Sequence, residues 1–166
     1  MYLFKPSLNG IATGGWSLNH PAMPSEFSIT RQVEFAETDM AGIMHFANFF
    51  YWMETCETAF YRSLGLPLIS FVPGRIVGWQ RVNVSCSNRA PLRFKDTVEV
   101  KLFVKQLGTR SVTYLFQFRR NGELAALGEV KAVCVTGDAN GGMVAQPIPA
   151  DIRAQLQEAP ASAYEG

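Results

Sequence analysis

The sequence predicts an α+β domain in which an antiparallel sheet of about five strands wraps one long central helix. Two observations predict it. Apolar residues recur at helical spacing over one long stretch, from Phe46 to Leu64. Most of the chain after Gly74 instead alternates apolar and polar residues, which is typical of strands with one buried face. The predicted order is therefore one strand, one long helix and then about four more strands.

The first strand is predicted over 27–35, where apolar residues alternate with polar neighbours. The helix over 46–64 begins with the run FANFFYWM, and a helix that is apolar on nearly every side is buried all round. Gly65 is well placed to end it, and Pro67 prevents its continuation.

The second half of the chain contains the remaining strands. Residues 76–88 predict one long strand with a bulge near Gln80, where the alternation changes parity. Asn121-Gly122 between two apolar runs is a strong hairpin signal. The other predicted elements are strands over 98–104, 112–118, 124–135 and 143–148, a turn over 137–142, and a short helix over 150–158 that Pro149 opens.

Length and composition limit the possible classes of protein. The 166 residues predict one domain over 26–160, after a loose extension over 1–25 that has no long apolar run for a signal peptide or membrane anchor. A net charge of +1 provides no global field for nucleic acid or an anionic membrane. The three widely spaced cysteines (Cys56, Cys86 and Cys134) are predicted to be reduced core residues, which favours the cytoplasm.

The stretch FAETDMAGIMHFANFF, residues 35–50, places two acids where a strand ends and an apolar helix begins. Its segment 38–49 resembles the signature of the hotdog-fold acyl-CoA thioesterases, most closely the 4-hydroxybenzoyl-CoA thioesterase group. That signature is Asp-x-x-Gly followed by an apolar residue, and then Asn followed by an aromatic residue. The similarity continues weakly through 90–96 and 107–111 and covers roughly 27–158.

The resemblance implies a hotdog fold with active sites at dimer interfaces, and therefore a homodimer or homotetramer. It implies an acyl-CoA substrate and no separate cofactor or metal. It places the catalytic carboxylate at Asp39 and a carbonyl-polarising backbone N–H at Phe46. Acyl transfer to water needs such a nucleophile or base and such a donor, and a helix N-terminus supplies free N–H groups. Asp39 either forms an anhydride or activates a water, and Gly42 lets the ligand approach the backbone.

Four further polar residues near this stretch have two interpretations each. A neutral His45 ring binds the substrate carbonyl or tunes Asp39, or it only packs in the loop. Asn48 contacts the substrate or satisfies loop backbone groups from inside. Glu54 reaches a neighbouring site across the dimer, or it pairs with Arg62 or another buried donor. Glu37 is interpreted as a solvated strand residue rather than a second catalytic acid.

Coenzyme A needs cations for its phosphates. The resemblance assigns them to Lys105 and Arg110, although Gly108 and Thr109 stand where some relatives have arginines. Phe49 is a candidate to line the acyl pocket, together with Phe50, Trp52 and Trp79. The sequence therefore predicts an acyl-CoA thioesterase for an aryl or short-to-medium acyl group. A non-catalytic acyl-thioester-binding module and a hotdog hydratase or dehydratase are the alternatives.

Overall fold

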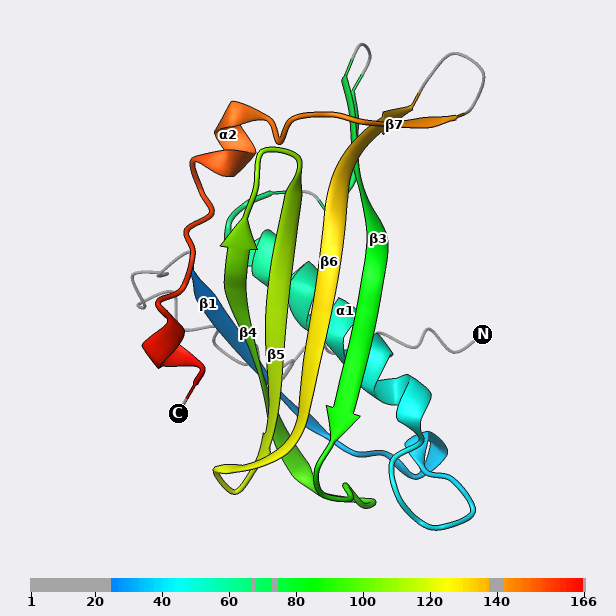
Figure 1. Ribbon diagram of the computed structural model, residues 1–166. Helices are drawn as coiled ribbons and strands as arrows, with labels where there is room; N and C mark the ends of the chain where they lie inside the picture. The colour runs from blue at the N-terminus through cyan, green and yellow to red at the C-terminus, as the bar shows by residue number, and fades with distance from the viewer. Residues whose placement is uncertain (1–24, 67, 73–74, 138–141, 166) are drawn as a thin grey trace, which may run out of the picture.

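The computed structural model describes residues 25–66, 68–72, 75–137 and 142–165, so the extension predicted over 1–25 lies almost entirely outside the described residues. One antiparallel sheet curves around a long helix, α1 (Phe46–Ser63), which crosses one face of the sheet (Figure 1). The strand order is β1-β4-β5-β6-β3-β2, and β7 also pairs with β6. The strands are β1 (Glu26–Gln32), β2 (Ser70–Val72), β3 (Arg75–Asn88), β4 (Thr97–Leu107), β5 (Ser111–Arg120), β6 (Glu123–Gly137) and β7 (Met143–Ala145).

The predicted architecture is confirmed, because five long strands form the body of the sheet and two three-residue strands, β2 and β7, extend it. The helix begins and ends within one residue of its predicted bounds. Asn121 and Gly122 both have positive φ, 52° and 83°, as the predicted tight hairpin turn requires. The bulge lies between Arg81 and Asn83, one to three residues beyond the predicted position.

Three elements end earlier than predicted. β1 ends at Gln32, and Phe35–Glu37 form a 3₁₀ turn that moves the chain from β1 towards α1. Helix α2 (Ala150–Arg153) stops five residues early, because the chain turns to place the Ala159 N–H on the Val104 carbonyl, 2.8 Å away. β7 ends at Ala145 because the next backbone groups bond outside a strand ladder, with Gln146 N–H donating to the Cys134 carbonyl.

The core lies between α1 and the concave face of the sheet. A close approach there depends on Gly128 of β6, where an added Cβ would overlap the sulfur of Met53 on α1. The three cysteines are free, as predicted; Cys56 and Cys134 are buried and Cys86 is half-buried. Burial raises the pKa of the Cys56 thiol to about 12, so this thiol is a packing group rather than a nucleophile.

Strand β3 leaves much of one edge uncovered. β2 pairs only with Arg75–Val77, so from Gly78 onward this edge has no partner strand in the described part of the chain. Val82 and Val84 on this stretch are 55% and 42% exposed. An unpaired edge with exposed apolar residues is a ready template for another strand. Among the described residues, no helix has the length and hydropathy to cross a membrane.

Candidate active site

Asp39 lies in a tight turn between the 3₁₀ segment and α1. Its N–H donates to the Ile43 carbonyl at 2.9 Å, and its own carbonyl accepts from Gly42 N–H at 2.9 Å. Gly42 has φ +69°, a conformation that favours glycine. The carboxylate Oδ1 accepts from Ala41 N–H at 2.8 Å, while Oδ2 has no hydrogen-bond partner among the described residues. The turn therefore orients an exposed carboxylate and leaves one of its oxygens open.

The N-terminus of α1 presents one free backbone donor. His45 caps the helix, since its Nδ1 accepts from Ala47 N–H at 3.3 Å and its carbonyl accepts from Asn48 N–H at 2.9 Å. Between them, the Phe46 N–H has no acceptor within the described residues. The structure thus has an unpaired N–H where the resemblance placed the carbonyl-polarising donor.

The His45 side chain has a role that the sequence did not reveal. In this cap Nδ1 accepts the backbone hydrogen bond, so Nε2 is the other polar atom of the ring. The ring also packs on Phe46, with the two centroids 4.5 Å apart. Histidine is not among the preferred N-cap residues, so no common sequence signal indicates this role. Only Nε2 remains for any contact with substrate.

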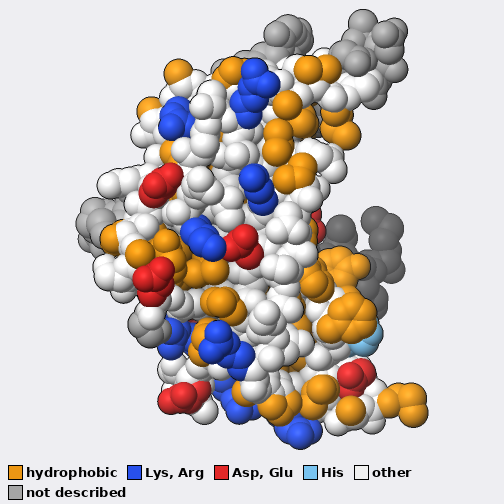
Figure 2. Space-filling view, viewed as in Figure 1, with side chains coloured by type: hydrophobic (Ala, Val, Ile, Leu, Met, Phe, Trp, Pro, Cys, Tyr) orange, Lys and Arg blue, Asp and Glu red, His pale blue; other side chains and the backbone are white. Residues whose placement is uncertain are grey.

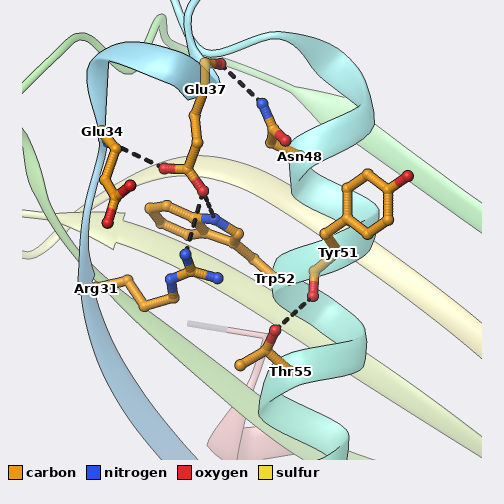
Figure 3. A network of polar contacts seen from close by, with 7 residues as sticks. All are labelled: Arg31, Glu34, Glu37, Asn48, Tyr51, Trp52 and Thr55. Carbon is orange, nitrogen blue, oxygen red and sulfur yellow. Dashed lines mark hydrogen bonds and ion pairs between the residues drawn. The ribbon is translucent and has the colours of Figure 1, made fainter.

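Glu37 is not the solvated residue that we predicted. Its side chain is only 15% exposed, and its Oε1 accepts from the Trp52 indole N–H at 2.7 Å and from Arg31 at 3.1 Å (Figure 3). Its backbone carbonyl accepts from the Asn48 side-chain amide at 2.8 Å. Asn48 therefore has the structural contact that was one of its two interpretations. Glu37 connects β1, the 3₁₀ turn and α1.

A shallow pocket of about 260 Å³ lies between the acidic turn and the end of β3. Its lining is mostly apolar and consists of Ile43, Met44, Phe49, Asn88, Arg89, Ala90, Pro91 and Leu92. Of the four predicted pocket aromatics, Phe49 lies here. Trp52 of α1 and Trp79 of β3 are 0% and 6% exposed, and both belong to the core between helix and sheet rather than to the lining of this pocket.

The family model of the thioesterase-like superfamily matches residues 33–156. The chain belongs to this superfamily. A 1,4-dihydroxy-2-naphthoyl-CoA hydrolase of Synechococcus sp. (strain CC9605) is 32% identical over 120 residues, which cover 68% of this chain and 77% of that protein. One from Prochlorococcus marinus (strain NATL1A) is 27% identical over 114 residues, covering 64% and 76%. The solved structure of a gentisyl-coenzyme A thioesterase has 28% identity and a TM-score of 0.66, covering 76% of this chain and 99% of that one.

These comparisons confirm the family recognised from residues 38–49 and, with the fold, the hotdog class. The protein is an enzyme of the thioester hydrolase class. In the part of this thioesterase that the structure describes, no group of three or more histidine, cysteine or acidic side chains could hold a metal ion.

The two cations assigned to coenzyme A lie far from Asp39 within the chain of this thioesterase. The acidic turn follows β1, and Gln32 at the end of β1 pairs with Thr97 at the start of β4. Lys105 lies eight residues further along β4, which is roughly 26 Å from Thr97. Lys105 also bonds to Glu129 at 2.6 Å, and this hydrogen bond raises the pKa of its amine. Arg110 lies in the β4–β5 turn at the same far end (Figure 1).

Other basic residues lie near the acidic turn. Arg89 lines the shallow pocket, and Arg93 Nη1 lies 3.5 Å from the Gly42 carbonyl oxygen. Lys95 lies over the Phe94 ring, 5.3 Å from its centroid. None of these three residues was predicted, because the motif of the family does not show which strand ends meet. Glu54 is exposed, and no ion pair with Arg62 is present among the described residues.

A buried ion pair between α1 and β3 was also missed. Glu57 is 1% exposed, and its Oε2 accepts from Arg81 Nη2 at 2.8 Å. Burial raises the pKa of Glu57, and Arg81 opposes this shift. Glu57 Oε1 and the Trp79 indole N–H have no partner among the described residues. The apolar helix face around Glu57 was the signal in the sequence that could have revealed a buried acid.

Proposed function

We propose that the protein hydrolyses an aryl-CoA or a short-to-medium-chain acyl-CoA to the free acid and coenzyme A, with no cofactor beyond the coenzyme that the substrate carries. Asp39 acts as nucleophile or general base, and the Phe46 N–H polarises the thioester carbonyl. One observation carries the proposal: a carboxylate with one open oxygen lies in the short loop directly before α1, and the first N–H of that helix is unpaired among the described residues. That pairing supplies the two groups that acyl transfer to water requires.

An aryl acyl group is the more favoured of the two classes. The pocket beside the turn is lined by Phe49 and by apolar residues, which suit a flat ring. Two relatives are named for thioesters with aromatic acyl groups, dihydroxynaphthoyl-CoA and gentisyl-CoA. The pocket is smaller than the several hundred Å³ of typical ligand sites, which supports a site completed by a second copy of the chain.

We expect thiol release from an acyl-CoA panel to identify the substrate class. The panel contains benzoyl, hydroxybenzoyl, gentisyl and naphthoyl thioesters beside acetyl, hexanoyl and decanoyl thioesters. The aryl members are expected to give the higher kcat/KM, because Phe49 and the pocket floor bury a planar ring. No thiol release from any member would contradict the proposed function, and a preference for the aliphatic members would contradict the assignment to aryl groups.

The proposed assembly is a homodimer, or a tetramer built from it, joined through the open edge of β3. Hydrophobic side chains gather on the side of the molecule that carries this edge and the start of α1 (Figure 2). Antiparallel pairing of two β3 edges would bring the far end of one protomer, with Lys105 and Arg110, towards the acidic turn of the other. This arrangement would allow them to contact the coenzyme. The free cysteines support a reducing cytoplasmic location.

Replacing Val82 and Val84 with lysine is expected to convert the dimer to a monomer. Two charges on each edge would face each other across the interface, and lysine on an edge strand opposes pairing. Light scattering of the purified variant measures the change in mass. The matched control is Met143→Lys with Val144→Lys, since these residues are also exposed apolar side chains, 65% and 52% exposed, but lie on β7. A wild-type monomer, or a variant that keeps the wild-type mass, would rule out the β3 interface.

A further inference from the structure

We infer that Glu37 is a positioning residue, which holds the Asp39 turn and the helix start at Phe46 in one fixed arrangement. The inference rests on the proposed function, because it concerns the placement of the two groups assigned to the reaction. Glu37 itself touches neither of them through its side chain. It acts through the segments on either side of the turn, and three elements meet at this one residue (Figure 3).

The carboxylate of Glu37 joins the turn to the sheet and to the helix. Its Oε1 accepts from Trp52 Nε1 at 2.7 Å and from Arg31 Nη2 at 3.1 Å, and its Oε2 accepts from Glu34 N–H at 3.0 Å. Trp52 is fully buried, and the Arg31 guanidinium lies 4.5 Å from the centroid of its ring. The indole and the guanidinium are thus both fixed by packing, so they hold the carboxylate in place.

The backbone carbonyl of Glu37 makes the second connection. It accepts from His45 N–H at 2.8 Å and from the Asn48 side-chain amide at 2.8 Å. These two donors lie on either side of Phe46. Because the His45 N–H is used here and the Ala47 and Asn48 N–H groups are used by the His45 cap, only the Phe46 N–H of this run stays free. Glu37 therefore helps to select the donor that the substrate meets.

A direct role for Glu37 in proton transfer does not fit its surroundings. Both carboxylate oxygens accept hydrogen bonds, its charge is paired with Arg31, and the side chain is 15% exposed. Asp39, two residues later, is exposed and keeps one oxygen open among the described residues. The two acids therefore have different roles, since Glu37 fixes the geometry and Asp39 faces the substrate.

Glu37→Ala is expected to lower kcat by about tenfold or more and to change KM by less than twofold. Reaction rates are sensitive to misplacements of an ångström, whereas binding of the acyl and nucleotide parts does not involve Glu37. Glu37→Gln should retain part of the lost activity, because its amide oxygen can still accept from Trp52. Trp52→Phe, which removes the indole donor together with part of the buried ring, should act in the same direction and less than additively with Glu37→Ala. The matched control is Glu99→Gln, which removes an exposed ion pair with Lys101 on β4.

Amide hydrogen exchange tests the same inference without any activity. In Glu37→Ala, the amides of Asp39, Gly42 and His45 should exchange faster than in the wild type, while those of β4–β6 keep their protection. Unchanged exchange at the turn, or an unchanged kcat, would overturn the positioning role. So would a loss confined to KM. If the wild type hydrolyses no thioester, the proposed function fails, and the exchange result still decides whether Glu37 holds the turn.

Discussion

Asp39→Asn is expected to reduce kcat/KM for every hydrolysed thioester by a factor on the order of a hundred or more. The change removes the proposed nucleophile or base and keeps the size of the side chain. The amide oxygen of asparagine can still accept from Ala41 N–H, which bonds to Asp39 Oδ1 at 2.8 Å, so the turn keeps its shape. The fold and the assembly should therefore be unchanged, and the loss should lie in the chemical step.

Single-turnover rates, measured with enzyme in excess over substrate, test this directly. The matched control is Asp151→Asn, which alters an exposed carboxylate on α2, far from the turn. Circular dichroism and light scattering check that both variants keep the wild-type fold and mass. A variant at position 39 with nearly full turnover would remove Asp39 from the mechanism and leave the open N–H of Phe46 without a chemical partner.

Arg81→Met is expected to cost about 3–5 kcal/mol of unfolding free energy at neutral pH, the largest stability effect that we predict. Arg81 is the only hydrogen-bond partner of the Glu57 carboxylate in the described part of the chain. Without the guanidinium, a 1% exposed charge remains inside the protein with no compensation. Methionine fills much of the same space, so the loss should reflect the charge rather than a cavity.

The loss should depend on pH in a defined direction. Burial raises the pKa of folded Glu57 above its usual value of 4.5, and removing Arg81 raises it further. The folded variant then keeps a proton that the unfolded chain releases, so its stability is greatest below the unfolded pKa and falls as the pH rises through the folded pKa. Urea unfolding at several pH values between 5 and 8 should show a growing deficit relative to the wild type.

The double variant Glu57→Gln with Arg81→Met provides the control for this pair. It contains no buried charge, so it should recover much of the lost stability and show no pH-dependent deficit. A single variant that loses less than 1 kcal/mol, or one whose deficit is the same at every pH, would show that water already compensates Glu57 in the wild type.

The parts of the molecule that the sequence predicted well depend on near neighbours in the chain. The helix bounds follow from periodicity and from Gly65, and the hairpin follows from Asn121-Gly122. Asp39 and Phe46 lie seven positions apart in one motif, so the sequence alone could place them at the two ends of one short loop. The alternation that extended β1 to Phe35 was misleading, because that ring is 76% exposed and contacts Phe94 in a distant loop.

The interactions that the sequence did not reveal join residues that the fold alone brings together. Trp52 reaches Glu37 because it lies one helical turn after Asn48, on the same side of α1, and both side chains donate to Glu37. Arg81 reaches Glu57 across 24 positions, and only the register of β3 and the bulge beside it determine which strand residue faces the helix. Lys105 and Arg110 were assigned by motif, and a motif does not show at which end of a sheet its residues lie.

Gly128 has a consequence for the chemistry, although it lies on β6, away from the acidic turn. The helix rests on the sheet where Met53 meets this glycine, and Phe46 is seven residues away at the end of the same helix, about 10 Å along its axis. A tilt of the helix about this contact therefore displaces its N-terminal end. A methyl group inserted there that tilted α1 by about five degrees would move the Phe46 N–H by roughly 1 Å, a displacement large enough to slow catalysis. The absence of a side chain at position 128 thus affects where the Phe46 N–H lies, although the two residues are not in contact.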